Sequence, residues 1–548
     1  MRKTEKLLQA SRKLSPAQRQ ALAKVSVPYF AEEMIYMENG EKFSFKDHKY
    51  LFELYAEHHD HVVVEKAAQM GITSWAFIMS IYHCINTFSL GTIYFFPTKT
   101  DVMDFSRGRI TPFIKYNKHI KILDDDDVDN VGLKRVGKSL IYFRGMQTDI
   151  GLKSVPSDQN VYDEIDEANP QAKDMADQRM EHSKFKWQKE LSNPTIENYG
   201  IDRSFQESDM RYWAIKCGHC NAWNILELEF PNCLLRKKDG TVIRVCKKCR
   251  KEISLDGKAQ WVAKKPSNKD KRGYHMSQLF SKYVSPKKIL DAYEEVSTTA
   301  LYKQETFYRL CLGMAFTSGQ NKLVKEDMLN LPRADMSINI HDYAFMGVDQ
   351  GNKLHSVIIK ELKDGHTGLM DIIVKTDFND IDKIMQDNKC LRLVIDAMPE
   401  TREAKRLAER HPGRVFLCYY NDNMKGNYKW TDDTENKNWL VSVNRTDSLD
   451  ASGSVIKEKK LIINKSINDS LVEEFAEQCC NLARKKEEAL DGSQRYVYIK
   501  TGPDHWRHAF NYSKIAATDF VESADVDMET IASAFDKAPE LVSAQFDG

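Results

Sequence analysis

The sequence predicts an α/β protein with two large domains, and three observations indicate this. A strand-like apolar run, Val62–Val64, leads through a short turn into a helix-like stretch that begins at Trp75. Two pairs of cysteines lie between residues 217 and 249. Beyond residue 340, strand-like runs that end in aspartate replace this pattern. With 548 residues the chain is too long for one hydrophobic core, so two or three domains are expected.

The turn before Trp75 is the first candidate site. It reads Lys66-Ala-Ala-Gln-Met-Gly-Ile-Thr-Ser74 and resembles a phosphate-binding loop, in which backbone N–H groups surround phosphates, a lysine contacts them and a hydroxyl holds Mg²⁺. Ile72 takes the usual lysine position, and Lys66 at the start of the loop supplies the charge instead. By itself, the pattern also fits an ordinary strand–glycine–helix turn. The predicted nucleotide-binding residues of this loop are Lys66, Gln69, Gly71, Thr73 and Ser74.

A second element supports phosphate chemistry. The run Asn160-Val-Tyr-Asp163-Glu164 follows a turn-rich segment and predicts a strand that ends in two acids. In an ATPase, Asp163 would hold Mg²⁺ and Glu164 would polarise the attacking water. The alternative is the acidic first turn of a helix, where Asp and Glu are also favoured. Two phosphate-chemistry elements in the right order favour the P-loop ATPase, with a RecA-like core.

Four cysteines indicate a structural zinc site. They form two C-x-x-C knuckles separated by 25 residues, a spacing that lets four thiolates converge on one Zn²⁺. The apolar residues between the knuckles partly alternate, which predicts the short strands of a zinc ribbon. A redox pair is the alternative, and His219 inside the first knuckle is a bystander. The predicted ligands are Cys217, Cys220, Cys246 and Cys249.

The second half predicts a metal-dependent nuclease domain. A strand at 344–349 carries Asp349, and two further strands follow around 356–361 and 368–375. A helix near 380–387 and a strand ending in Asp396 come next. Together with a late helix that opens near Asp504, this is the element order of an RNase H-like nuclease, whose acids hold two Mg²⁺ or Mn²⁺ ions. The third metal position stays open between Asp504, His505 and His508.

Composition gives no overall preference for nucleic acid. Lys+Arg and Asp+Glu each number 80, so a DNA-binding surface must be local, with basic stretches at 236–238, 247–248 and 264–265 as candidates. No run approaches the roughly 18 apolar residues of a membrane span, and the N-terminus lacks a signal-peptide core. We expect a soluble, cytoplasmic protein.

With these parts in order, the chain resembles the large terminase subunit of tailed bacteriophages, the lambda-type branch above all, over roughly residues 45–520. The displaced loop lysine is typical of these motors. Ser192-Asn-Pro-Thr195 resembles their coupling motif, which links loss of the γ-phosphate to movement. The segments 273–279 and 307–313 also resemble that branch. The resemblance implies ATP, Mg²⁺ or Mn²⁺, and Zn²⁺ as cofactors.

Two features depart from the family pattern. The coupling motif is short and lies some way past Glu164. The last nuclease motif commonly reads D-H-x-x-D-A-x-R-Y, whereas this chain has His508 for the second acid and Asn511 for the arginine, which implies an altered metal preference. An arginine finger is expected, and its candidates are Arg107, Arg109 and Arg144.

The resemblance also implies boundaries and partners. We expect a helical region at 1–40 that binds the small terminase subunit, an ATPase domain at 41–330 with the ribbon at about 212–262, and a nuclease domain at 340–525. We expect the acidic tail at 526–548 to bind the portal protein, and the run Asp124–Asp127 to form a solvated loop. The implied assembly is a homo-oligomeric ring on the portal in the host cytoplasm.

The leading hypothesis is a motor that moves double-stranded DNA into a procapsid with ATP and cuts concatemeric DNA with a metal-dependent endonuclease. A cellular helicase–nuclease is the first alternative, but the C-terminal half shows no second phosphate loop. The second alternative is a zinc-stabilised nucleic-acid-binding protein with inactive sites, which Ile72 and His508 would favour.

Overall fold

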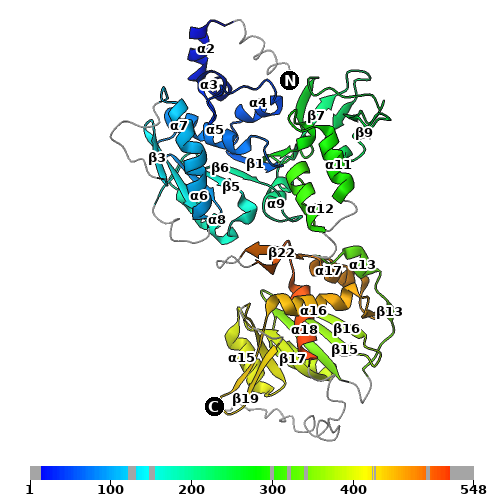
Figure 1. Cartoon of the computed structure of the whole chain (residues 1–548). Coiled ribbons are helices and arrows are strands. Elements are labelled where there is room, and N and C mark those ends of the chain that lie inside the picture. The colour runs from blue at the N-terminus through cyan, green and yellow to red at the C-terminus, as the bar shows by residue number, and fades with distance from the viewer. Residues whose placement is uncertain are drawn as a thin grey trace. The chain divides into compact units, whose positions relative to one another are not determined.

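The structure is a computed structural model of the 548-residue chain. The chain divides into two compact units, Met1–Ser318 and Gly319–Gly548, and Figure 1 labels the elements of each. No helix in the described part of the chain is long and apolar enough to cross a membrane. The expected acidic tail and the Asp124–Asp127 run lie outside the described residues. The structure describes residues 14–120, 131–146, 155–296, 301–317, 322–338, 343–422, 424, 428–488 and 494–518.

A large, mostly parallel sheet forms the centre of the first unit. Its strand order is β11-β7-β12-β1-β6-β5-β2-β4-β3, with β8 paired to β7. β1, β6, β5 and β2 all run parallel, so their carboxyl ends meet at one edge of the sheet, where ligands bind in such folds. The strands are β1 (His61–Lys66), β2 (Thr92–Phe96), β3 (Leu133–Val136), β4 (Ser139–Gly145), β5 (Gln159–Asp163), β6 (Trp187–Ser192), β7 (Arg211–Lys216), β8 (Trp223–Ile225), β11 (Ala259–Ala263) and β12 (Arg272–Met276).

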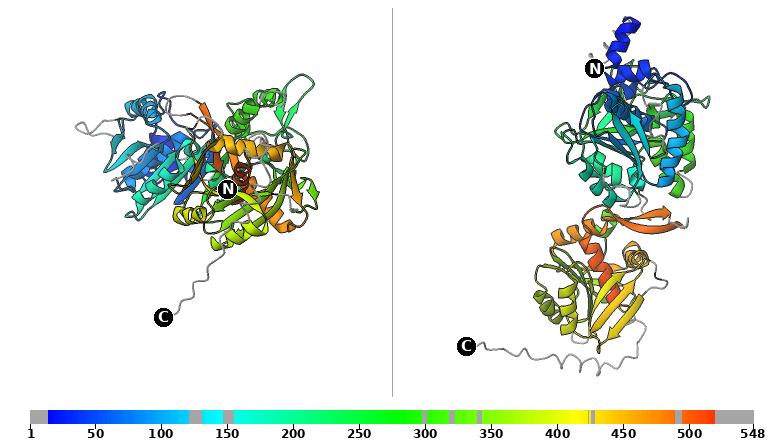
Figure 2. Two further views of the ribbon diagram at one scale, coloured as in Figure 1. Left: turned by 90° about the horizontal axis from the view of Figure 1, so that it is seen from below. Right: turned by 90° about the vertical axis from the view of Figure 1, so that its left-hand side faces the viewer.

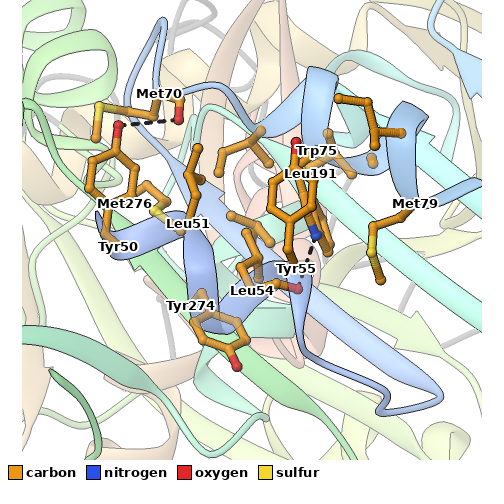
Figure 3. Packing of buried hydrophobic residues seen from close by; sticks show 14 of the residues in the cluster. Tyr50, Leu51, Leu54, Tyr55, Met70, Trp75, Met79, Leu191, Tyr274 and Met276 are labelled. Atoms are coloured by element: carbon orange, nitrogen blue, oxygen red, sulfur yellow. Dashed lines mark hydrogen bonds between the residues drawn. The ribbon is translucent and has the colours of Figure 1, made fainter. Parts of the chain in front are cut away.

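Helices pack against this sheet around a buried apolar core. Apolar side chains of α4, α5 and the neighbouring strands form one core, in which the Trp75 indole donates to the Leu54 carbonyl at 3.0 Å (Figure 3). The dark-blue helix α2 lies at one edge of the unit (Figure 1 and the right view of Figure 2). The helices are α2 (Pro16–Ala23), α3 (Val27–Met34), α4 (Lys49–Tyr55), α5 (Ile72–Asn86), α6 (Lys99–Phe105), α7 (Thr111–Tyr116), α8 (Pro170–Asp177), α9 (Gly200–Gln206), α11 (Pro286–Val296) and α12 (Leu301–Phe307).

The cysteine knuckles lie in an insertion between β7 and β11. It contains β8, the short helix α10 (Leu226–Glu229) and the hairpin of β9 (Leu234–Arg236) and β10 (Val242–Arg244). The expectation that the whole apolar stretch after the first knuckle forms strands is wrong beyond Ile225. The Glu229 carboxylate accepts a hydrogen bond from the Ile225 backbone N–H at 3.0 Å and closes a helical turn there, which leaves Leu228 50 % exposed.

The second unit has a sheet with the order β13-β21-β16-β15-β14-β17-β18-β20-β19 and a separate hairpin, β22–β23. β14, β15 and β16 run antiparallel, whereas β17 and β18 run parallel to β14. The strands are β13 (Arg333–Ala334), β14 (Ala344–Gln350), β15 (Leu354–Glu361), β16 (Thr367–Lys375), β17 (Cys390–Asp396), β18 (Val415–Tyr420), β19 (Tyr428–Asp433), β20 (Asn438–Val443), β21 (Leu461–Asn464), β22 (Leu482–Glu488) and β23 (Gln494–Lys500).

The last helix, α18, crosses this sheet over β14, β15 and β17 (Figure 1). A Cβ at Gly347 would lie 2.1 Å from the Ala509 carbonyl oxygen and from the Ser513 nitrogen, so only glycine allows this close approach. The acids that end β14 and β17 therefore lie beside the start of α18. The helices are α13 (Lys325–Leu329), α14 (Asn379–Asp387), α15 (Thr401–Arg410), α16 (Arg445–Lys457), α17 (Asp469–Cys479) and α18 (His505–Ala516).

Candidate active sites and metal centres

The predicted phosphate-binding loop joins β1 to α5. Lys66 is the last residue of β1, and Gly71, with φ +80°, occupies the N-cap of α5 in a left-handed conformation. No side chain caps this helix and its first turn holds no acid, so its N-terminal N–H groups suit an anion. Gln69 is exposed at the tip of the loop with φ 58°, where it can meet a ligand but contacts none of the catalytic side chains described below.

Lys66 reaches both acids of the second predicted element. Its Nζ lies 2.5 Å from Glu164 Oε1 and 4.0 Å from Asp163 Oδ1. Burial alone would lower the pKa of Lys66, but the carboxylates of Glu164 and Asp163 outweigh it and raise that pKa. The displaced lysine is therefore charged and lies where phosphates would meet the acids.

Asp163 has the surroundings of a magnesium ligand. Tyr94 donates to its Oδ2 at 2.9 Å, and the Thr73 hydroxyl is a further partner. Its Oδ1 is buried without a hydrogen-bond partner among the described residues. Burial raises the pKa of Asp163 to about 6, although the charge of Lys66 opposes this. A buried carboxylate whose Oδ1 accepts no hydrogen bond from the described residues, beside a threonine hydroxyl, fits the Mg²⁺ of a phosphate-loop enzyme.

Glu164 is held in a strained conformation by the coupling motif. Its φ of 56° lies in the left-handed region, which costs a non-glycine residue on the order of 1–3 kcal/mol and recurs at functional sites. The Ser192 hydroxyl and the Asn193 backbone N–H donate to its Oε2 at 3.2 and 3.1 Å. The Asn193 amide also donates to the Lys66 carbonyl at 2.7 Å. Residues 192–193 therefore contact both sides of the catalytic pair.

Asp166 is a residue that the sequence interpretation missed. It is fully buried and accepts hydrogen bonds from the Thr195 backbone and hydroxyl at 2.8 and 2.7 Å and from the Ile201 N–H at 2.6 Å. It thereby fixes the far end of the coupling motif to the strand that carries Asp163. The acidic run that follows Glu164 was the available signal for it.

A further segment closes on the phosphate loop. The Ala68 backbone N–H donates to the Leu310 carbonyl at 2.9 Å, and Arg309 donates to the Pro194 carbonyl at 3.0 Å. At Gly313 an added Cβ would lie 2.6 Å from the Ala67 nitrogen. The segment around residues 307–313 therefore links the loop to the coupling motif.

The three arginine-finger candidates differ in their surroundings. Arg144 donates to the Gly132 carbonyl at 2.8 Å and has its pKa lowered by burial, as expected of a structural residue. Arg107 is exposed. Arg109 pairs with Glu38 at 3.2 Å and lines a small cavity together with Ser74, and its charge acts on Lys66. Among the three, Arg109 is the one associated with the loop.

The four knuckle cysteines converge. Sγ of Cys217 lies 3.7 Å from that of Cys249, Sγ of Cys220 lies 3.6 Å from that of Cys246, and all four atoms lie within 4.8 Å of one another. A tetrahedral ZnS₄ centre with Zn–S bonds of about 2.3 Å requires S···S distances of about 3.8 Å. The backbone N–H of Cys220 lowers the pKa of the Cys217 thiol, which favours the thiolate. The four side chains fit zinc, and exposed His219 is not part of the group.

The nuclease acids lie at the carboxyl ends of adjacent parallel strands. Asp349 belongs to β14 and Asp396 ends β17. Burial raises the pKa of Asp396, and the neighbouring charge of Asp349 adds to this. Tyr512 of α18 donates to Asp396 Oδ2 at 3.0 Å and orients it. Two carboxylates at the ends of adjacent parallel strands are suited to share a cation.

Two histidines complete a ligand group around Asp349. His505 Nδ1 lies 2.8 Å from Asp349 Oδ2, and the rings of His355 and His505 stack with centroids 4.6 Å apart. One ligand atom from each of the three residues falls within 4.8 Å of the others. Burial lowers the pKa of His355 to about 4, which keeps its imidazole in the neutral form that binds metals. Its Nδ1 is buried with no hydrogen-bond partner among the described residues.

His355 was missed in the sequence although a signal existed. The register of the β14–β15 hairpin places it directly opposite Asp349, and the interpretation began this strand two residues too late. Asp504 and His508 form their own pair, with His508 Nε2 3.4 Å from Asp504 Oδ2 and Nδ1 2.9 Å from the Tyr420 hydroxyl. His508 acts on Asp396 through its charge.

Comparisons with known proteins agree with this architecture. The family model described as phage terminase large subunit gpA, ATPase domain, matches residues 52–265. The crystal structure of the HK97 bacteriophage large terminase has a TM-score of 0.52 and 9 % identity, and the match covers 90 % of this chain and 99 % of that chain. A large terminase from a thermophilic bacteriophage, solved in complex with ADP, has a TM-score of 0.30 and 13 % identity, with 84 % and 94 % covered. No curated protein has a significant sequence match. The predicted α/β fold, a P-loop-type sheet followed by an RNase H-like sheet, is confirmed.

Proposed function

We propose that this chain, which over residues 52–265 matches the ATPase domain family of phage terminase large subunits, is a DNA-packaging motor with a nuclease. The first unit would hydrolyse ATP to move double-stranded DNA into a procapsid, and the second would cut concatemeric DNA. The observation that carries the proposal is the contact of Lys66, from the phosphate loop, with Glu164 and Asp163.

The contacts support a role for each residue of the proposed ATPase site. MgATP is the substrate, and Thr73 and Asp163 are placed to hold its metal ion while Lys66 contacts its phosphates. Glu164 orients the attacking water, because its carboxylate is fixed from the other side by Ser192 and Asn193. Arg109 is the finger that we propose for the developing phosphate charge.

The same contacts suggest how hydrolysis is linked to movement. In the structure Lys66 pairs with Glu164, and phosphates that attract Lys66 would weaken this pair. Glu164 would then be held by the coupling motif alone. A change in the position of the Glu164 carboxylate would be transmitted to Ser192 and Asn193 through their hydrogen bonds. Asp166 and Arg309 hold the remainder of that motif, so displacement would pass to the segments that they anchor.

In the nuclease unit, Asp349, His355 and His505 would hold one divalent ion, and Asp396 would extend the site toward a second. Such ions activate water and stabilise the leaving oxygen of a phosphodiester. Imidazole nitrogens suit transition-metal ions better than Mg²⁺. We therefore propose Mn²⁺ or a similar ion as the preferred cofactor of this unit.

Zinc, the partners and the location belong to the same proposal. The four cysteines would hold one structural Zn²⁺. The helical region 1–40, of which α2 and α3 are described, would bind the small terminase subunit, and the tail at 526–548 would bind the portal protein. The working form would be a ring on the portal in the host cytoplasm.

A helicase–nuclease remains the competing function. It would need a second nucleotide-binding core, and the described residues of the second unit form a nuclease-like sheet instead. Packaging of DNA into purified procapsids separates the two proposals.

The test is Glu164→Gln. This variant keeps the size of the side chain and removes the carboxylate that orients water, so DNA-stimulated ATP hydrolysis should fall by at least about 100-fold. Binding of a fluorescent ATP analogue should stay within about threefold of wild type because the phosphate loop is unchanged. Glu181→Gln, an exposed glutamate of the same unit that pairs with Lys186, is the matched control. Wild-type turnover by Glu164→Gln would remove this residue from the mechanism.

A further inference from the structure

The second unit contains a polar cavity that the nuclease site does not use. It has a volume of about 290 Å³ and lies between α16, α18 and the hairpin β22–β23. Four cationic side chains and one carboxylate line it, together with a tyrosine hydroxyl. The residues are Lys322, Asp450, Lys457, Arg484, Tyr498 and Arg507.

Arg507 is the deepest of these cations. It is 1 % exposed and donates to the Ser452 hydroxyl at 2.9 Å and to the Leu449 carbonyl at 2.5 Å, both neutral acceptors. Among the described residues, no carboxylate lies within 4.0 Å of its guanidinium. A Cβ at Gly453 would lie 3.0 Å from its Nη2, so this glycine makes room for the group. A buried guanidinium without a counter-ion is costly unless an anion compensates it.

The one acid among the described lining residues is already engaged. Asp450 pairs with Arg484 at 3.0 Å and accepts a hydrogen bond from the Tyr498 hydroxyl at 2.8 Å. Burial lowers the pKa of Lys457, Asp450 opposes this, and the charges of Arg507 and Arg484 add to the lowering. The cavity is thus a concentration of positive charge that a single carboxylate does not balance.

The cavity lies on a different face of α18 from the metal ligands. Arg507 is directed toward α16, whereas His505, two residues earlier, contacts Asp349. The wall strand β23 leads to the start of α18, where Lys500 pairs at 2.5 Å with Asp504, the residue before the proposed metal ligand His505. An occupant of the cavity would therefore be distinct from the metal but connected with it through the hairpin.

We propose that this cavity binds a phosphate group, and that the phosphate belongs to the backbone of the DNA that the nuclease unit holds. Guanidinium and ammonium groups form charge-assisted hydrogen bonds with phosphate oxygens, and such contacts position a duplex without reading its sequence. The choice of DNA as the source of the phosphate rests on the proposed nuclease function. Phosphate binding itself follows from the charge of the cavity and does not depend on that function.

The test uses the full-length double variant Lys322→Gln with Lys457→Gln, which removes two cations and leaves the Asp450–Arg484 pair intact. Duplex binding is measured by fluorescence anisotropy in Ca²⁺, where no cleavage is expected, at several salt concentrations. We expect the affinity for duplex DNA to fall by about tenfold. The magnitude of the slope of log K against log salt concentration should decrease by about 0.9 for each phosphate that the variant no longer neutralises. Calorimetric titration with inorganic phosphate provides the second arm.

The matched control is Lys325→Gln with Lys460→Gln, which makes the same charge change at lysines that pair with Glu477 and Glu458 outside the cavity. Loss of both DNA and phosphate binding in the cavity variant alone supports a DNA backbone site. Loss of phosphate binding alone assigns the cavity to free phosphate and overturns the DNA source. Wild-type behaviour in both arms overturns the proposal. A wild-type protein that binds DNA but never cuts it would instead contradict the nuclease function and leave this site standing.

Discussion

At the residue scale, Asp163 gives the ATPase a predictable pH dependence. Burial raises the pKa of this carboxyl to about 6, so it becomes protonated as the pH falls through that value. A protonated carboxyl cannot hold Mg²⁺, and kcat/KM for MgATP reports groups of the free enzyme. We expect kcat/KM to be full above the pKa and to fall below it. A profile that stays flat from about pH 8 to about pH 5, with the protein still folded by circular dichroism, would contradict the role of Asp163.

His355 sets the second prediction at this scale. His355→Ala removes a nitrogen ligand opposite Asp349 and leaves the acids in place. Since imidazole favours transition-metal ions, the ratio of plasmid cleavage rates in Mn²⁺ and Mg²⁺ should fall by about tenfold or more. His366→Ala, in an exposed turn of the same unit, is the control and should keep the wild-type ratio. An unchanged ratio in His355→Ala would remove this side chain from the metal site.

Residues close in sequence to a recognisable motif could be predicted, and those that depend on pairing between strands could not. Lys66 ends one predicted strand, and Glu164 follows another. Because both strands belong to one parallel sheet, the contact between the two side chains follows from the strand order. His355 depends on the β14–β15 register, which changes with the exact start of a strand. Arg507 depends on how α18 packs against α16, which no local pattern encodes.

At the element scale, the zinc ribbon should depend on its metal for folding. Elemental analysis of the full chain should find one Zn²⁺ per protein, and Cys217→Ser or Cys249→Ser should lose it. Because the binding energy of a closed four-thiolate site is folding energy for the insertion, these variants should become protease-sensitive between β7 and β11. Cys233→Ser, a cysteine of the same insertion outside the cluster, should keep the zinc. A soluble and protease-resistant chain without zinc would contradict the prediction.

Elements with a strong local pattern could be predicted from the sequence. β1, α5, β5, β14 and β17 each follow from an apolar run with a defined end. The short helix α10 replaces a predicted strand because its turn is closed by one side-chain contact of Glu229, which apolar spacing does not reveal. The hairpin β22–β23 was not predicted; β22 is mostly charged and lacks the apolar run that marks the other strands, and it forms a separate two-stranded sheet with β23.

At the scale of the whole molecule, the two candidate sites lie in two compact units of one chain. Lys66, Asp163 and Glu164 belong to the first unit, and Asp349, Asp396 and His505 belong to the second. Each unit has its own sheet, and its site residues lie at strand ends or at the start of a helix that packs on the sheet. The two proposed activities should therefore be separable by single substitutions.

The last prediction tests this separation. Asp349→Ala and Asp396→Ala should each abolish plasmid cleavage in Mn²⁺, because each removes a carboxylate from the metal site and a displacement of about 1 Å can cost on the order of 100-fold in rate. ATP hydrolysis should stay within about twofold of wild type, since the other unit carries it and substitutions at distant, unconnected sites act independently. Asp371→Ala, a half-buried acid of β16 in the same sheet, controls for damage to the unit. If both variants still cut DNA, the nuclease assignment of the second unit is wrong. If either also loses ATPase activity, the two sites are coupled through the chain.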